Sequence, residues 1–372
     1  MTATLWTKRL VYTCRMVADI FVSEPSELLQ IFLAEGLEYL GTAHVPASGP
    51  DLEEAQTRYD QWLAEGRNGT MKYLDRHGPA KYHPDSVLEG TRSVIFAGLQ
   101  YFQPRPEAAP ASGLVARYAW GRDYHKVLLK KLQRITTVLS AQWPQERWRS
   151  FTDTAPLDER WWAAQAGASF TARNTLAINR RLGSWFLLGE ILTTKAFPAT
   201  GPRPHAHGTC PSACRRCTDV CPTGALGADG RMDATRCISY LTIEHQGPID
   251  DELKSGIQSW LFGCDLCQEV CPFNLAVRPT QEPEFLAWKA GPDLDLGQIL
   301  ALGEAEFTAR FAGSPVHRTG RSGLVRNACL VAANLGRIEL RDRILDLCDD
   351  PNPGVADAAR WAIQKLTQGS AS

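Results

Sequence analysis

Two cysteine-rich runs near the centre of the chain decide how the rest of it can be interpreted. Residues 210–222 read CPSACRRCTDVCP, and residues 264–272 read CDLCQEVCP. Each run ends in C-x2-C-x3-C-P, and each is preceded by one further cysteine, Cys210 for the first run and Cys237 for the second. Two sets of four thiolates, each with one member directly before a proline, are the ligand pattern of two 4Fe–4S clusters.

The spacing also predicts how the ligands are shared. In this pattern the cysteine before the proline leaves its own loop and binds the other cluster, which places the two clusters close together. We therefore expect two sets: Cys210, Cys214, Cys217 and Cys271 for one cluster, and Cys221, Cys237, Cys264 and Cys267 for the other.

Three alternatives use the same residue type. Zinc ribbons also contain C-x2-C pairs, although the repeated x3-C-P ending is not a zinc feature. A disulfide framework is typical of small secreted chains rather than of a long, mixed sequence. Cys210, Cys214 and Cys217 have the spacing of a radical S-adenosylmethionine loop, but the 155 residues after Cys217 also contain the second cysteine set and a helical tail.

Composition indicates a packed globular protein of two or three domains, with 372 residues, 44% hydrophobic and 22% charged. The formal net charge is −1, so a nucleic-acid partner would have to be held by a local basic patch. No apolar run approaches the roughly 18 residues of a membrane span, and residues 1–16 lack the apolar core of a signal peptide. We expect a cytoplasmic protein without a membrane segment, in which Cys14, Cys329 and Cys348 are free thiols.

Four segments are predicted, with residues 1–24 as an N-terminal extension. Residues 25–197 alternate helical and strand patterns, which indicates an α/β or α+β domain. Helices of this domain are expected at 25–65, 126–139 and 159–166. Strands are expected at 93–99 and 149–153, and a loop at 102–112. Residues 198–280 form the cluster domain, entered through a linker at 198–209. Residues 281–372 form a tail whose helices at 323–336, 338–348 and 355–367 flank an acidic Pro turn at 349–354, as in a HEAT-type repeat.

Candidate catalytic residues lie in the first domain. Neither the dinucleotide fingerprint nor the phosphate loop is present. Asp153 follows a predicted strand, and partial burial would raise its pKa into a range useful for proton donation. The alternative is that Asp153 caps the following helix. The sequence Asp123-Tyr124-His125 begins like a cobalamin loop that carries a histidine ligand, but Leu128 stands where that loop has glycine.

Several segments together resemble the epoxyqueuosine reductase family. The segments that carry the resemblance are CISYLTIE (237–244), FGCDLCQEVCPFN (262–274), YAWGRDYHK (118–126), DTAP (153–156), NTL (174–176) and GSWFLLGE (183–190). The resemblance covers about residues 25–370. It implies an α+β fold with an N-terminal nitroreductase-like cobalamin domain, a two-cluster ferredoxin-like domain and an α-helical HEAT-like tail.

The family's function follows from the same resemblance. It implies reduction of the epoxide of epoxyqueuosine, at the wobble position of a tRNA anticodon, to queuosine. The cofactors would be cobalamin and two 4Fe–4S clusters, supplied with electrons by an external low-potential donor. Asp153 would be the proton donor, and the residues from His317 to Arg326 would bind anticodon-arm phosphates in a monomeric enzyme. The implied cobalamin contacts are Asp123, Tyr124, His125, Asn174, Ser239 and Thr242.

Three departures from the family pattern bear on function. The family spaces its first three cysteines x2, x2, whereas Cys210 and Cys214 are separated by three residues. The family sequence Gly-Trp-Ile-Gly-Lys-Asn is replaced at residues 169–174 by SFTARN, and Tyr82-His83-Pro84-Asp85 replaces its Arg-x-Asp-Pro. These changes keep two alternatives open: a related corrinoid reductase, such as a reductive dehalogenase-like enzyme, and a non-enzymatic electron-transfer module.

Overall fold

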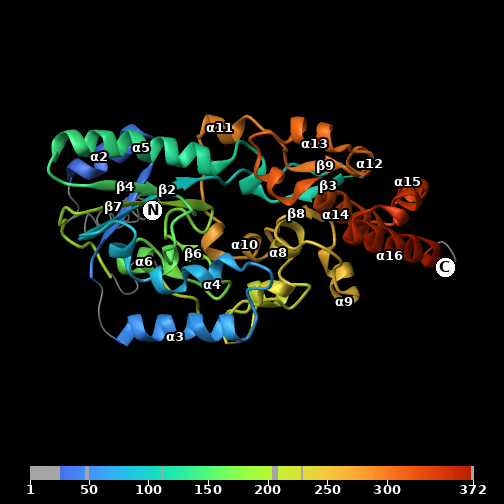
Figure 1. Cartoon of the computed structure of the whole chain (residues 1–372), viewed down its shortest axis with the longest axis horizontal. Coiled ribbons are helices and arrows are strands. Elements are labelled where there is room, and N and C mark those ends of the chain that lie inside the picture. Colours follow the sequence, from blue (N-terminus) through green and yellow to red (C-terminus); the bar gives the residue numbers. More distant parts are fainter. Residues whose placement is uncertain (1–25, 47–49, 110–111, 203–207, 228, 370–372) are drawn as a thin grey trace, which may run out of the picture.

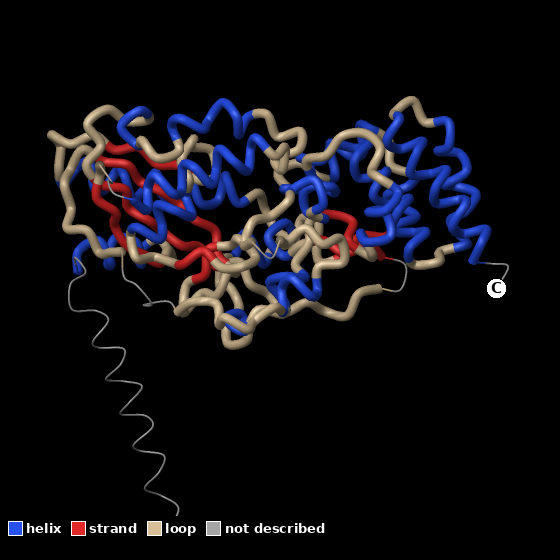
Figure 2. Tube along the Cα trace, turned by 90° about the horizontal axis from the view of Figure 1, so that it is seen from below, coloured by secondary structure: helices blue, strands red, loops and turns tan. Residues whose placement is uncertain are grey.

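Mixed helix and sheet are arranged along one long axis in the computed structural model of the chain, which describes residues 26–46, 50–109, 112–202, 208–227 and 229–369 (Figure 1). The largest sheet lies at one end, the cysteine loops lie in the middle, and the C-terminal helices lie at the other end (Figures 1 and 2). The predicted mixture of helix and sheet is confirmed. The N-terminal extension and Cys14 lie outside the described residues.

The main sheet has four antiparallel strands in the order β1-β2-β7-β4. Their bounds are Glu38–His44, Ser93–Gln100, Phe186–Thr193 and Trp148–Phe151 for β1, β2, β7 and β4 respectively. Helices α2 (Ser26–Ala34) and α5 (Tyr124–Gln142) cover one face, and α6 (Glu159–Gln165) covers the other. The expected strands at 93–99 and 149–153 and the helices at 126–139 and 159–166 are confirmed.

Helix α5 shows why these elements form. The carboxylate of Asp123 caps its start by accepting a hydrogen bond from the backbone N–H of His125. Leu128, Leu132, Ile135 and Leu139 recur at helical spacing and are fully buried against the sheet.

The helices expected within 25–65 are confirmed as α2 and α3 (Pro50–Ala64), but the strand between them was not expected. Residues 38–44 form β1, an edge strand between α2 and α3. Five consecutive residues of β1 are buried, so the strand lacks the alternation that marks a half-exposed strand. Its pairing register also shifts between Tyr39 and Gly41, where Gly41 has a φ of 152°. A bulged strand of this kind carries a weak sequence signal.

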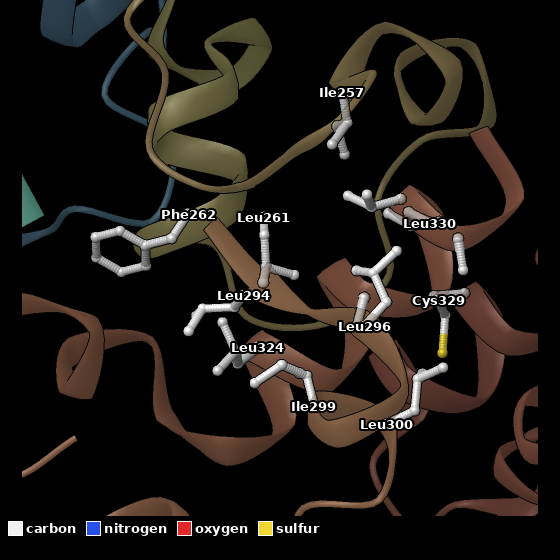
Figure 3. Packing of buried hydrophobic residues seen from close by; sticks show 14 of the residues in the cluster. Ile257, Leu261, Phe262, Leu294, Leu296, Ile299, Leu300, Leu324, Cys329 and Leu330 are labelled. Atoms are coloured by element: carbon white, nitrogen blue, oxygen red, sulfur yellow. The ribbon is translucent and has the colours of Figure 1, made fainter. Parts of the chain in front are cut away.

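A second sheet joins parts of the chain that are far apart in sequence. Strand β3 (Ser112–Val115) lies between β8 (Trp260–Phe262), to which it is parallel, and β9 (Asp293–Asp295), to which it is antiparallel. The buried cluster around it extends from Val115 to Leu366. Figure 3 shows Leu261 of β8 near Leu294 and Leu324, whereas Phe262 points away from them. All of these residues, with Cys329 and Leu330 of α14, belong to one buried cluster. The predicted domain boundaries stay a prediction.

The remaining helices surround the cysteine loops and form the tail. Around the loops lie α4 (Tyr73–His77), α7 (Arg216–Val220), α8 (Ile238–Ile243), α9 (Asp251–Lys254) and α10 (Leu266–Glu269). Beyond them follow α11 (Pro283–Leu286), α12 (Leu296–Leu300), α13 (Glu304–Arg310), α14 (Gly320–Asn334), α15 (Arg341–Asp346) and α16 (Pro353–Gly369). Short strands β5 (Phe170–Thr171) and β6 (Ala177–Ile178) pair with each other. Among these described helices, none is long and apolar enough to cross a membrane.

The basic segment from His317 to Arg326 is mostly structural, which corrects the expectation that it binds phosphates throughout. Arg326 is 2% exposed and donates to the carbonyl oxygens of His245 and Gly247 at 2.8 and 3.1 Å and to that of Leu241. Arg321 pairs with Asp350 at 3.1 Å. Arg318, in the same segment, is about half exposed.

Replacement of Arg326 by alanine should destabilise the protein strongly. The change leaves three buried carbonyl groups without their charged donor, and we expect a loss of about 3 kcal/mol or more in the free energy of unfolding. Urea unfolding of the intact protein measures this loss. Arg341→Ala, at an exposed arginine, is the matched control, and equal effects of the two variants would contradict a structural role for Arg326.

Candidate functional site

A cavity of about 430 Å³ lies where the main sheet meets the cysteine loops. Its lining includes both cysteine thiols and the carboxylate of Asp153. Most of the remaining lining is apolar. The residues that line the cavity include Tyr118, Tyr124, Asp153, Glu159, Asn174, Phe186, Leu188, Cys221, Cys237, Ser239, Cys264, Cys267 and Gln268.

The division of the thiols into two ligand sets stays a prediction. Burial raises the pKa of the Cys271 thiol, and the charges of Cys210 and Cys214 add to it, so Cys271, although part of the second run, lies near two cysteines of the first predicted set. Burial also raises the pKa of Cys267, and the charges of Cys237, Cys217, Asp265 and Cys221 add to it in that order, so cysteines of both predicted sets lie near Cys267. The second predicted set comprises Cys221, Cys237, Cys264 and Cys267. The four thiols of this second set line the cavity. Among the described residues, no three His, Cys, Asp or Glu side chains converge on a position for a single metal ion.

Two of the departures from the family pattern meet in space at Cys210. The thiol of Cys210 accepts a hydrogen bond of 3.3 Å from the backbone N–H of Arg173. Phe170 and Ala172 pack beside Cys210 and Cys271 in one small apolar cluster. The longer Cys210–Cys214 spacing and the altered residues 169–174 therefore form one local structure at the first cysteine set.

Asp153 occupies a turn at the end of β4 and is held by a network on α5. Its Oδ2 accepts a hydrogen bond of 2.7 Å from the Tyr124 hydroxyl and lies 3.5 Å from Nε2 of His125. The other ring nitrogen of His125 lies 2.8 Å from Oδ1 of Asp123. The helix-capping alternative for Asp153 is wrong, because Asp158 caps α6 by accepting from the backbone N–H of Trp161.

The protonation states around Asp153 differ from the sequence prediction. Desolvation by the surrounding side chains favours the neutral acid, although the Asp153 side chain itself is 61% exposed. Hydrogen bonds from His125 and Tyr124, with the charges of His125 and Arg318, outweigh this effect and lower the pKa of Asp153. Burial likewise opposes the charged form of His125, yet its contacts with Asp123 and Asp153 raise the pKa of His125 to about 9. At neutral pH the proton nearest the cavity is therefore held on His125 rather than on Asp153.

The other predicted cofactor contacts divide into two groups. Asn174 and Ser239 line the cavity, and the Asn174 amide donates to the carbonyl oxygen of Cys267 at 3.4 Å. Thr242 does not line it: its hydroxyl donates to Ile238 and accepts from the backbone N–H of Gly263, which joins α8 to β8. Asp123 and His125 act through Asp153 and do not line the cavity themselves.

Sequence reasoning missed a pair of acidic residues behind Asp153. Oε1 of Glu159 accepts a hydrogen bond of 2.7 Å from the backbone N–H of Asp153. The carboxyls of Glu159 and Glu190 are in hydrogen-bonding contact, and Glu190 is 0% exposed. One signal was available, since Glu190 interrupts the apolar pattern of a buried strand.

Comparisons with known proteins agree with this site. A 4Fe–4S double cluster binding domain matches residues 210–274, and the family model "Epoxyqueuosine reductase QueG, DUF1730" matches residues 81–154. An epoxyqueuosine reductase from Xanthomonas campestris pv. campestris is 37% identical over 85% of this chain and 90% of that protein. One from Pseudomonas aeruginosa is 35% identical over 92% and 95% of the two chains. This chain belongs to the epoxyqueuosine reductase family.

Solved structures of epoxyqueuosine reductases show the same fold. A crystal structure of an epoxyqueuosine reductase with an epoxyqueuosine-modified tRNA-Tyr stem loop has a TM-score of 0.81 and 28% identity, over 92% of this chain and 89% of that one. The enzyme from Bacillus subtilis, with a TM-score of 0.80 and 27% identity over 92% and 90%, was solved with a catalytic Asp loop swung out of the active site. The resemblance inferred from the sequence is confirmed at the level of the family.

Replacement of His125 by glutamine should remove a pH-dependent part of the stability. The pKa of His125 is raised on folding, so its contribution is full below about pH 6.5, the unfolded value, and is lost as pH rises through about 9. We expect the melting temperature of the wild type to fall more than that of His125→Gln between pH 6.5 and 9.5. His83→Gln, at an exposed histidine, is the control; parallel curves for wild type and His125→Gln would contradict the assignment.

Proposed function

We propose that this member of the family reduces the epoxide of epoxyqueuosine at the tRNA wobble position to give queuosine. The observation that carries the proposal is the cavity itself. Its lining includes four cysteines, proposed to hold one cluster, together with Asp153 and Tyr124, and His125 contacts Asp153. The cluster that would supply electrons and the carboxyl that would supply a proton are thus proposed to lie at one cavity.

The two cysteine sets are proposed to hold two 4Fe–4S clusters with exchanged fourth ligands. The first set comprises Cys210, Cys214, Cys217 and Cys271, and the second comprises Cys221, Cys237, Cys264 and Cys267. The position of Cys271 beside Cys210 and Cys214 supports this exchange. Because only the second set lines the cavity, the first set is the entry point for electrons from an external low-potential donor.

Cobalamin is the second proposed cofactor, and the cavity fits a large, mostly apolar ring with polar substituents. Apolar side chains such as Phe186 and Leu188 form much of the lining, while Ser239, Asn174 and Gln268 supply hydroxyl and amide groups. No histidine occurs among the described residues that line the cavity, so none is placed there to bind cobalt. When bound, cobalamin supplies a low-potential metal centre that delivers electrons to the epoxide.

The protein's own residues supply the protons. Conversion of an epoxide to an alkene consumes two electrons and two protons, and the oxygen leaves as water. Asp153 is the proposed donor to that oxygen because it faces the cavity. His125 is protonated at neutral pH and contacts Asp153, so it can return a proton to the Asp153 carboxylate.

The proposed macromolecular partner is the anticodon stem-loop of a tRNA. The related enzyme solved with such a stem loop supports this partner. Arg318 is about half exposed, pairs with Glu244 and helps to lower the pKa of Asp153, so it is the proposed phosphate-binding residue near the site. We further propose a cytoplasmic monomer with a nitroreductase-like first domain, a ferredoxin-like cluster domain and a HEAT-like tail, matching the order of the observed elements.

Replacement of Cys210 by serine should cost one cluster. A serine hydroxyl is a poor replacement for a thiolate ligand, and we expect the iron content to fall from that of two clusters toward that of one. Iron and sulfide analysis with electron paramagnetic resonance of the reduced protein measures this. Cys348→Ser, outside both sets, is the control. Retention of both clusters in Cys210→Ser would remove this ligand from the assignment.

Nucleoside mass spectrometry tests the reaction directly. In cells that lack their own epoxyqueuosine reductase, with cobalamin supplied, expression of this chain should convert epoxyqueuosine in tRNA to queuosine. Asp153→Ala should abolish conversion while iron and cobalamin contents stay unchanged. Persistent epoxyqueuosine with a fully loaded wild-type protein would argue against the proposed substrate, and full activity of Asp153→Ala would remove Asp153 from the mechanism.

A further inference from the structure

Glu190 lies where the sheet pattern calls for an apolar side chain. Its neighbours on the same face of β7 are Leu188 and Leu192, which pack in the apolar layer beneath α6. In the sheet it is paired with Phe96 of β2 and Phe151 of β4. Glu190 is 0% exposed, and no N–H or hydroxyl group reaches either of its carboxyl oxygens. A charged carboxylate without donors is very unfavourable at such a position.

The contact with Glu159 lowers the free-energy cost of burying the Glu190 carboxyl only if the two carboxyls share a proton. Two carboxylates side by side repel each other, whereas one neutral carboxyl can donate a hydrogen bond to the other. Burial raises the pKa of both groups. The charges of Glu190 and Asp153 add to the effect at Glu159, and those of Asp153 and Asp158 add to it at Glu190. The pair therefore retains a proton at a pH where an exposed glutamate has lost it.

Glu159 connects this buried pair to the turn that carries Asp153. Its Oε1 accepts the backbone N–H of Asp153 at 2.7 Å. Asp153 has a φ of 53°, a left-handed conformation that non-glycine residues adopt only when held by their surroundings. The neighbouring Thr152 hydroxyl donates to the carbonyl oxygen of Leu188 at 3.2 Å, so both tethers of the turn lead back to β7.

We propose that Glu190 is a positioning residue that, by sharing a proton with Glu159, holds the backbone of Asp153 in its left-handed turn at the cavity. Glu190 does not touch the substrate and acts through Glu159. Loss of the shared proton leaves two carboxylates in contact, which drives Glu159 away from Glu190 and weakens the hydrogen bond to Asp153. The catalytic role of Asp153 in this inference rests on the proposed function. The positioning of the Asp153 backbone by Glu159 and Glu190 does not depend on that function.

Other charged groups that face the pair are few. Lys81 and Arg160 are the nearby cations, and Lys81 is 9% exposed with its ammonium 4.7 Å from the ring centre of Tyr59. Asp153 and Asp158 are the nearby anions. His125 acts on the other side of Asp153 and stays protonated to about pH 9. Burial raises the pKa of Glu190 to about 7, so the pair is expected to titrate between pH 6.5 and 8.5. Lys81, whose pKa burial lowers, is the other titratable cation that faces the pair.

Amide hydrogen exchange of the purified holoenzyme tests the inference without substrate. In the wild type, exchange of the peptide containing Asp153 should accelerate from pH 6.5 to 8.5 beyond the intrinsic increase of exchange with pH. Glu190→Gln keeps a donor toward Glu159 but cannot lose a proton, so its protection should not depend on pH. Glu190→Leu removes the donor, and protection should fall about tenfold at both pH values, in line with the loss of one hydrogen bond.

Turnover provides a second readout that separates positioning from mere folding. Glu190→Gln should match the wild type at pH 6.5 and exceed it at pH 8.5. Glu190→Leu should lower kcat by about tenfold or more, because misplacement of a catalytic group by about 1 Å has effects of that size. KM for the modified stem loop should stay the same. Glu89→Gln, at an exposed glutamate, is the control.

Two results would overturn the inference. If exchange at Asp153 is the same in all variants, Glu190 does not hold the turn. If Glu190→Gln is protected normally but loses turnover at both pH values, Glu190 passes on a proton rather than positions Asp153. A wild type that does not reduce epoxyqueuosine would refute the proposed function, while the exchange data would still decide the role of Glu190.

Discussion

A buried carboxylate holds the two halves of the site together. Asp265, 1% exposed, lies between Cys264 and Cys267, and its Oδ2 accepts hydrogen bonds of 2.9 Å from the guanidinium groups of Arg105 and Arg117. Both arginines come from the segment on either side of β3, which leads directly into Tyr118 and α5. Removal of Asp265 would leave two guanidinium groups without this buried partner, and breaking a buried pair in this way costs about 3–5 kcal/mol. The distance between the cavity-lining thiols and the Asp153 network therefore depends on this ion pair.

The electrostatics of the cavity combine two opposite environments around a single turn. In front of Asp153, His125, Tyr124 and Arg318 stabilise its charged form. On its backbone side, desolvation favours the neutral carboxyls of Glu159 and Glu190. The side chain of Asp153 thus contacts a cationic histidine, while its backbone N–H contacts a carboxyl whose pKa is raised. A carboxylate in such a position can change its protonation state without moving far, since its donors and its backbone support come from different elements.

Features that depend on local spacing were predictable from the sequence, and features that depend on burial were not. The cysteine pattern was sufficient for the 4Fe–4S double-cluster domain, because the loop spacing itself is the ligand pattern. Helix α5 was recognisable from its period and cap. Strand β1, the interior position of Arg326 and the direction of the Asp153 pKa were missed, because each depends on residues distant in the chain. Glu190 was quoted within a motif, but its partner Glu159 becomes apparent only when α6 packs on the sheet.

Strand β3 has a consequence for how this chain is made. Its four residues are synthesised early, but its partners β8 and β9 lie about 145 and 180 residues later. A nascent chain that has completed the main sheet still exposes β3 with unpaired backbone groups on both edges. The cavity wall is equally incomplete at that stage, because its thiols emerge with the later partner. The cavity lining is complete once Gln268 has been synthesised, and the sheet around β3 once residue 295 has been, so a chaperone that shields β3 until then would protect the nascent chain from aggregation.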